Sequence, residues 1–266
     1  ESQPLKLKYT GKNSHEITLT QEQIKEYLNF ERNQEIQDWY PTVPLIPNSR
    51  ISAREGMTVA DLFTKRELAC HARLFSLILH YSSGAEQQLL LMAFTANLAN
   101  CSILVPPISS RGEMSQGAWM TGFYTGKTYI ENNVLHYFEN RLEKVIKGKE
   151  DFLSKTVTGL FDPLHGKEPE YRISHLDAKH LDDIADESID YIFTDPPYGD
   201  TVPYFEQSII WNAWLGIKPD YNNEIVISNS NVRNKDIAHF EKDIFDSFQE
   251  IHRVLKSGKY FSLTYH

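Results

Sequence analysis

The chain has 266 residues, of which 41% are hydrophobic and 24% are charged, and its formal net charge is −9. This composition is typical of a soluble globular protein with one large domain or two modest ones. The longest apolar runs, such as Leu89–Ala93, are too short to cross a bilayer, and the acidic excess argues against a protein that binds polyanions without a local basic patch, another domain or a partner.

The N-terminus and the cysteine content bear on the location of the protein. The first residues lack the basic-then-apolar pattern of a secretory signal. Only two cysteines occur, Cys70 and Cys101, and no second pair stands at zinc-ligand spacing. We therefore expect a cytoplasmic protein with reduced thiols and no metal centre, a disulfide between the two being the alternative.

The N-terminal part is predicted to be a hairpin followed by a helix. Apolar and polar residues alternate over residues 5–19 around Gly11-Lys12-Asn13, which predicts a β-hairpin with a Gly/Asn turn. Thr20 followed by Gln23 resembles a capping box, which would open a helix that runs to about Phe30.

The next hundred residues are predicted to be mainly helical. Three prolines between Tyr40 and Arg50 indicate an extended connector. Apolar residues then recur at helical spacing in three segments, Thr58–Ser82, Glu86–Leu104 and Asn133–Ile146.

After Asp151 the pattern changes to short strands alternating with helices. Strands are predicted at Tyr171–His175, Ile189–Phe193 and Tyr260–Tyr265, the second of them buried. Helices are predicted at Tyr204–Leu215 and Asp236–Leu255, with Ser257-Gly258 as a helix stop. This alternation indicates an open, largely parallel α/β sheet. The predicted domains are residues 1–50, 51–150 and 151–266.

One loop carries the chemistry. The apolar strand Ile189–Phe193 leads into Asp195-Pro196-Pro197-Tyr198, at the carboxyl end of a strand, where ligands bind in open α/β sheets. The two prolines fix the backbone and remove two N–H donors, which leaves carbonyl acceptors on a rigid turn. Such a loop would hold an NH2 group by two hydrogen bonds, one to Asp195 and one to the Pro196 carbonyl.

A base amine has the chemistry that this loop would bind. Its lone pair is delocalised into the ring, and two acceptors on its N–H bonds favour a pyramidal nitrogen and stabilise positive charge as a methyl group arrives. The ring of Tyr198 can stack on a base that has left the duplex. The alternative is a surface turn, since Asp and Pro are common turn residues.

These four residues resemble the signature of the amino-methylating DNA methyltransferases, which use S-adenosylmethionine to methylate N6 of adenine or N4 of cytosine. The flanks extend the resemblance to steps of that family at His175–Ala178, Glu187–Ile192 and Arg253–Gly258. Asp200–Tyr204 and Leu62–Leu68 are similar to segments of a subgroup of large adenine-specific DNA methylases.

The resemblance implies a fold, a cofactor and a partner. The fold is a partial Rossmann-like methyltransferase sheet over residues 151–266, preceded by the mainly helical segment. Asp195, Pro196, Pro197 and Tyr198 would clamp and stack a DNA base, with Asp at the first position favouring adenine. Asp177, together with Asp195, would contact S-adenosylmethionine, although a loop aspartate or helix cap explains Asp177 equally well.

The sequence also departs from the family. The glycine-rich cofactor loop (Phe-x-Gly-x-Gly) is missing, and the chain stops within a predicted strand at His266. We therefore expect a fragment or a split subunit, in which a missing segment or a second polypeptide supplies that loop, and a chain that is catalytically silent alone.

Several other residues have a structural and a functional interpretation. Tyr204 could line a base pocket but is better explained as core, and Trp211 and Trp214 as residues that pack their helix onto the sheet. His71 and His80 are better explained as core or surface histidines than as metal ligands. Arg111 and Lys127 could touch phosphate, although solvated loop charge is the simpler interpretation.

Two hypotheses follow. The first is an S-adenosylmethionine-dependent DNA adenine methyltransferase domain, truncated or completed by a partner, with RNA as a weaker alternative substrate. The second is a non-catalytic nucleic-acid-binding or assembly module that keeps the fold but has lost cofactor binding.

Overall fold

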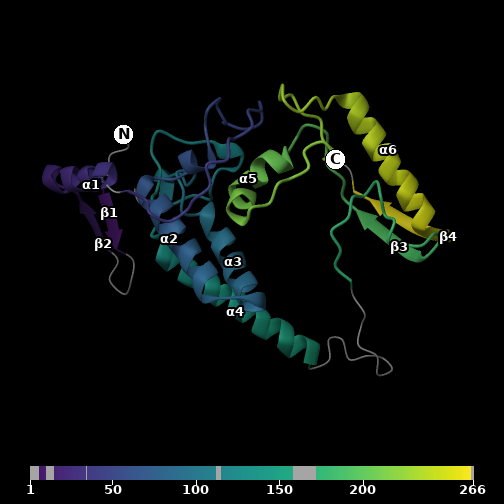
Figure 1. Ribbon diagram of the computed structural model, residues 1–266, viewed down its shortest axis with the longest axis horizontal. Coiled ribbons are helices and arrows are strands. Elements are labelled where there is room, and N and C mark those ends of the chain that lie inside the picture. The colour runs from purple at the N-terminus through teal and green to yellow at the C-terminus, as the bar shows by residue number, and fades with distance from the viewer. Residues whose placement is uncertain (1–5, 10–14, 34, 112–114, 158–171, 265–266) are drawn as a thin grey trace. The chain divides into compact units, whose positions relative to one another are not determined.

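A computed structural model of the chain describes residues 6–9, 15–33, 35–111, 115–157 and 172–264. The chain forms two compact units: unit 1 is Glu1–Val43 with Thr58–Gly148, and unit 2 is Pro44–Met57 with Lys149–His266. The predicted boundary after residue 150 lies beside the observed one. The predicted domain of residues 1–50, by contrast, is divided between the two units. Figure 1 labels the helices and strands.

The predicted hairpin and first helix are confirmed. Strands β1 (Lys6–Tyr9) and β2 (His15–Thr18) pair antiparallel, and the predicted turn residues lie outside the described part of the chain. Helix α1 spans Gln21–Asn33. Its capping box is formed as expected, because the Thr20 N–H donates to Gln23 Oε1 at 3.0 Å and the Gln23 N–H donates to Thr20 Oγ1 at 3.2 Å.

The prediction of one helix from Thr58 to Ser82 is wrong. A short 3-10 helix, η1 (Val59–Leu62), is followed by α2 (Lys65–Tyr81). The break lies at Thr64, which has extended backbone and caps α2: its Oγ1 accepts from the Glu67 N–H at 3.1 Å, and Glu67 Oε2 accepts from the Thr64 N–H at 3.1 Å. A capping residue has extended backbone, so it ends the helix before it and starts the helix after it.

The other helices of unit 1 differ from their predicted ends. Helix α3 spans Gly84–Leu98 and stops before Leu104. The chain tightens there into a turn, in which the N–H groups of Asn100 and Cys101 both donate to the Asn97 carbonyl at 3.0 Å. Helix α4 spans Val134–Val157, well past the predicted end. Two further 3-10 turns, η2 (Ser109–Arg111) and η3 (Thr121–Phe123), lie between α3 and α4.

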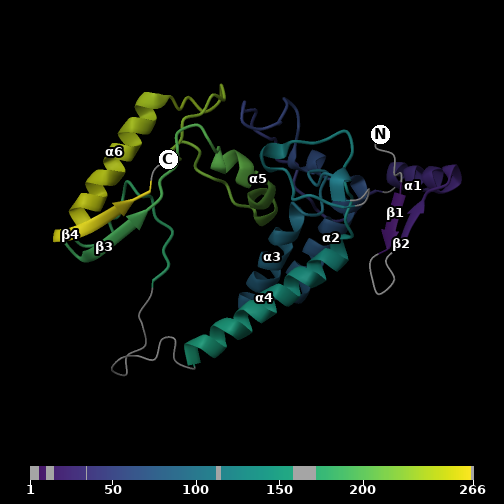
Figure 2. The same ribbon diagram turned by 180° about the vertical axis from the view of Figure 1, so that it is seen from behind.

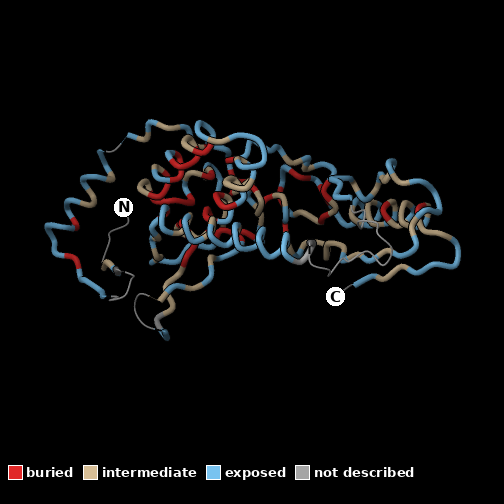
Figure 3. Tube along the Cα trace, turned by 90° about the horizontal axis from the view of Figure 1, so that it is seen from below, coloured by how far each residue is buried: buried red, intermediate tan, exposed pale blue. Residues whose placement is uncertain are grey.

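The core of unit 1 comes from η1, α2 and α3. Leu62, Phe94 and Leu98 are fully buried, and the ring centroid of the buried His71 lies 5.8 Å from that of Phe94. Figure 3 shows these buried stretches as red segments of the tube. Core packing of this kind is the main source of helical stability.

Unit 2 has a small parallel sheet covered on one face by a helix. Strands β3 (Ile189–Thr194) and β4 (Leu255–Leu263) pair in parallel. Helix α6 (Ile237–Val254) lies along this pair in both views (Figures 1 and 2), and its Phe248 ring packs 5.8 Å from that of Phe261 on β4. Helix α5 spans Tyr204–Leu215 as predicted. The protein thus combines helices and strands, and each of its two described sheets has two strands.

Three predictions for unit 2 are wrong. Residues 172–175 have no regular structure, and Ile173 is 90% exposed, with no strand beside it. Strand β3 is not buried, since Tyr191 and Phe193 lie on the face away from α6 and are 55% and 63% exposed. Ser257-Gly258 does not stop a helix: both residues lie within β4, where Gly258 has a φ of +75° beside an irregularity in the register.

Candidate active site

The Asp-Pro-Pro-Tyr loop begins where β3 ends. The Thr264 N–H, just past the end of β4, donates to the Thr194 carbonyl at 3.1 Å, so the parallel pairing continues to the residue before Asp195. The loop therefore leaves the carboxyl end of a parallel strand, the position where open α/β sheets bind ligands.

Within the loop, Asp195 and Tyr198 contact each other. Asp195 is exposed, whereas Pro196, Pro197 and Tyr198 are half-buried. The Tyr198 hydroxyl donates a hydrogen bond to Asp195 Oδ1, and this bond raises the pKa of the phenol above its ordinary value. Among the described residues, no other group donates to Asp195 and none donates to the Pro196 carbonyl. One carboxylate oxygen and one rigid carbonyl are thus available as acceptors.

The end of the loop is fixed by a glycine. Gly199 has a φ of +61°, a conformation that other residues rarely adopt, and its carbonyl accepts from the Ile227 N–H at 3.1 Å. A Cβ added at Gly199 would lie 3.3 Å from Ile227 Cδ1. The Thr201 hydroxyl donates to the Tyr198 carbonyl at 2.8 Å, which closes the turn.

A segment far away in sequence also holds the loop. Pro44–Met57, which we call the strap, belongs to unit 2. Arg50 on the strap donates to Asp200 Oδ2 from Nη2 at 2.6 Å and from Nε at 3.2 Å, across 150 residues of sequence. Ser49 donates its N–H to Asn229 Oδ1 at 3.0 Å. Sequence reasoning missed this contact because no local pattern links Arg50 to Asp200.

A buried charge cluster supports the helix that follows the loop. The Phe205 N–H, in the first turn of α5, donates to Glu224 Oε1 at 3.0 Å. The buried Arg233 donates to the other oxygen of Glu224, and its Nη1 lies 2.7 Å from Glu206 Oε2, an ion-pair distance without the alignment of a hydrogen bond. Burial raises the pKa of Glu224, and Arg233 opposes that rise. This cluster was also missed, since buried charges carry no periodic signal.

Asp177 lies in a turn and is half-buried. Its Oδ1 accepts from the Lys179 N–H at 2.9 Å, and its Oδ2 lies 3.9 Å from Lys179 Nζ. The ammonium of Lys179 is shared with Asp243 at 3.2 Å. No hydrogen bond or ion pair joins Asp177 to the described residues of the Asp195 loop. Its carboxylate caps its own turn, and its contact with the cofactor stays a prediction.

The remaining candidates are placed as follows. Tyr204 is 51% exposed, so its prediction as a core residue is wrong; the buried face of α5 begins at Glu206 instead. Trp214, on α5, is buried. The ring that packs on β4, however, comes from α6 rather than from α5. His71 is buried and His80 is exposed, as predicted for core and surface histidines. Arg111 and Lys127 are exposed, and their role stays a prediction.

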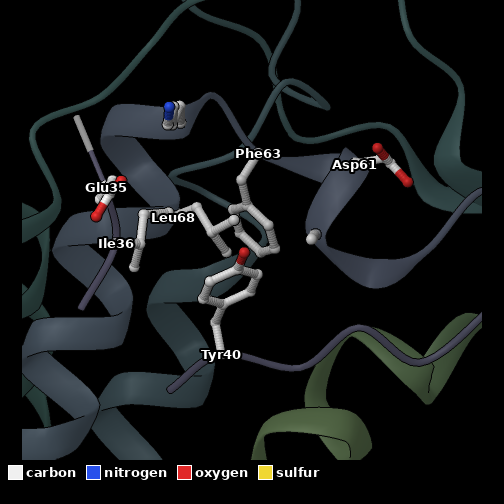
Figure 4. A pocket seen from close by; sticks show the side chains of 8 residues that line it. Glu35, Ile36, Tyr40, Asp61, Phe63 and Leu68 are labelled. Carbon is white, nitrogen blue, oxygen red and sulfur yellow. The ribbon is translucent and has the colours of Figure 1, made fainter. Parts of the chain in front are cut away.

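A separate hollow of about 610 Å³ lies in unit 1 (Figure 4). Its apolar wall includes Tyr40, Phe63 and Leu68, and its rim carries Glu35 and Asp61. All of its lining residues belong to unit 1, so this hollow is not part of the Asp195 loop.

The described residues provide neither a metal site nor a membrane span. No group of three or more His, Cys, Asp or Glu side chains there is placed to hold a metal ion, and no helix there is long and apolar enough to span a membrane. Both cysteines are free. Comparison of the chain with protein-family models, with curated proteins and with solved structures gives no match.

Proposed function

We propose that this chain carries the base-binding loop of an S-adenosylmethionine-dependent DNA methyltransferase that methylates N6 of adenine. The observation that carries the proposal is the pair of acceptors at the end of β3: the exposed carboxylate of Asp195 and the Pro196 carbonyl, which accepts no hydrogen bond from the described residues. A rigid acceptor pair, in which Pro196 and Pro197 contribute no N–H donors, favours a group with two donors, such as an exocyclic NH2.

The loop would act on the base as follows. One amine N–H would donate to Asp195 and the other to the Pro196 carbonyl, which holds the nitrogen lone pair out of the plane of the ring. Because the Tyr198 hydroxyl occupies Asp195 Oδ1, the amine would take Oδ2 or displace the hydroxyl. The ring of Tyr198 would stack on the extruded base.

The proposal does not place the cofactor site among the described residues of this chain. Asp177, the residue assigned to the adenosyl group by resemblance, caps its own turn and lies beside the ammonium of Lys179. The glycine-rich loop of the family is absent from the sequence. The proposal therefore assigns this chain the binding and orientation of the base, and a further segment or polypeptide the main contacts to the cofactor.

The test is transfer of a radioactive methyl group from S-adenosylmethionine to duplex DNA by the full-length protein, followed by nucleoside analysis for N6-methyladenine. We expect Asp195→Ala to lower kcat on the order of 100-fold or more, the usual loss when one preorganised electrostatic contact is removed. Asp183→Asn, another exposed loop carboxylate, is the matched control and should retain activity. Methyl transfer by Asp195→Ala at the wild-type rate would contradict the proposal.

A non-catalytic nucleic-acid-binding or assembly module is the second candidate. The hydrogen bond from Tyr198 to Asp195 favours it, because this bond occupies part of the acceptor pair. Calorimetric titration separates the two: a module of this kind would bind DNA but take up no S-adenosylmethionine, even with its full set of segments present.

A further inference from the structure

A protein that handles DNA must meet phosphate charge with local cations, and this chain has 27 basic and 36 acidic residues. Six cations in the described part of unit 2 are paired with acids close to them in the fold. Their partners are Asp243 for two lysines, Glu206 and Glu224 for Arg233, Glu250 and Asp186 for Arg253, and Asp190 for two further lysines. The pairs of Lys179, Arg233 and Lys235 are buried and hold the fold together. Phosphate contacts are therefore expected from the exposed cations of the unit.

The strap offers such cations beside the loop. Arg50 is bound to Asp200, two positions after Tyr198, and the side chains of this pair are 50% and 44% exposed. An exposed ion pair of this kind contributes little to stability, so a phosphate can compete with Asp200 for the guanidinium. Arg54 is exposed on the same strap.

The strap is held in place by contacts other than Arg50. Ile51 is 5% exposed, and Asn48 Nδ2 donates to Ser228 Oγ at 3.4 Å. Ser49 is bound to Asn229 through both its backbone and its side chain. Arg50 therefore reaches from an anchored backbone to Asp200, two residues past Tyr198 at the end of the loop. Arg, Ser and Asn are also residue types that contact DNA phosphates.

We propose that Arg50, assisted by Arg54, binds backbone phosphates of the DNA strand next to the extruded base, and that Asp200 holds Arg50 in position when DNA is absent. This inference rests on the proposed function, because it takes DNA as the polyanion. It gives the strap a role in substrate binding that none of its sequence patterns indicates.

The experiment measures binding of a fluorescein-labelled mixed-sequence DNA duplex by anisotropy at several salt concentrations, without cofactor. We expect Arg50→Ala to weaken binding about five- to tenfold at 0.1 M salt and to reduce the slope of log K against log salt by about 1, the value for one phosphate contact. Arg54→Ala should act in the same direction. Asp200→Asn should strengthen binding, because it releases Arg50.

The matched control is Arg172→Ala, which removes an exposed arginine of unit 2 paired with Asp183 at 3.0 Å. It makes the same change in net charge, so it should leave the slope unchanged. The inference is overturned if Arg50→Ala and Arg172→Ala bind alike, or if the wild-type protein does not bind the duplex at 50 mM salt. Thermal unfolding of each variant reports whether the fold is kept. Because binding is read without methyl transfer, the two failures differ: equal binding by Arg50→Ala and Arg172→Ala overturns this inference alone, whereas a protein that binds the duplex but transfers no methyl group overturns the proposed function alone.

Discussion

At the residue scale, the ring and the hydroxyl of Tyr198 have separate roles beside Asp195. The hydroxyl occupies Asp195 Oδ1 in the absence of a base, whereas the ring is the surface on which a base would stack. We expect Tyr198→Phe, which keeps the ring, to bind DNA as tightly as the wild type or more tightly. Tyr198→Ala should raise the Kd roughly 5- to 150-fold, since base stacking contributes about 1–3 kcal/mol.

The measurement is the Kd for a duplex that carries an unpaired adenine, which lowers the cost of extrusion. A fully paired duplex of the same sequence is the control and should discriminate less between the two variants. If Tyr198→Phe and Tyr198→Ala lose binding equally, the hydroxyl rather than the ring contacts the base.

The sequence identified Asp195 to Tyr198 because four adjacent residues make a complete chemical unit. It could not identify Arg50 or the Glu206–Arg233–Glu224 cluster, since these depend on contacts between distant segments. The structure places this loop at the end of β3 as the sequence indicates, and the role of its four residues stays a prediction.

At the scale of single elements, the N-terminus of α2 carries a buried acid. Burial raises the pKa of Glu67 from about 4.5 to about 8, so the folded state keeps a proton that the unfolded state loses between these values. The free energy of unfolding therefore falls as pH rises through this window. Burial lowers the pKa of His71 from about 6.5 to about 3, so its contribution falls as pH drops below about 6.5.

Between pH 4.5 and 6.5 these two effects oppose each other, and above pH 6.5 the effect of Glu67 acts alone. We expect Glu67→Gln, which keeps an acceptor for the Thr64 N–H but cannot ionise, to abolish the decrease in stability that Glu67 causes between pH 6.5 and 8. Urea unfolding followed by circular dichroism at pH 6.5 and 8 measures this. The control is Glu139→Gln, which removes an exposed carboxylate on α4 and should leave this decrease unchanged. If the free energy of unfolding of Glu67→Gln still falls between pH 6.5 and 8 as much as that of the wild type, the assignment is refuted.

Prediction of elements succeeded where one local signal decides the structure. The capping box of Thr20 and Gln23 opened α1 as expected, and α5 ends before Gly216, whose φ of +67° terminates the helix. It failed where tertiary contacts decide. Thr64 divides an apolar run that has continuous helical spacing, and Gly258 adopts a bulge within β4 rather than a helix stop.

For the whole molecule, the unexpected feature is that unit 2 is discontinuous in sequence. The strap is separated from the rest of the unit by Thr58–Gly148, yet Leu45 and Ile51 on it are only 4% and 5% exposed. No sequence pattern shows which unit the strap packs against, because a segment with three prolines and few charges indicates a connector in either case. A two-stranded sheet with one covered face is a weak core. The strap adds to it the hydrogen bonds of Asn48, Ser49 and Arg50 with Ser228, Asn229 and Asp200.

We therefore expect a fragment of residues 149–266 to be markedly less stable than the same unit in the full chain. Burial of Leu45 and Ile51 contributes about 1.5–3 kcal/mol each, which is a large part of the stability of a small unit. A synthetic peptide of residues 44–57 added in excess should raise the midpoint of thermal unfolding of the fragment, and the same peptide with Leu45→Ser and Ile51→Ser should not. If the fragment alone unfolds at the temperature of the full chain, the strap is a connector that rests on unit 2 rather than a structural part of it.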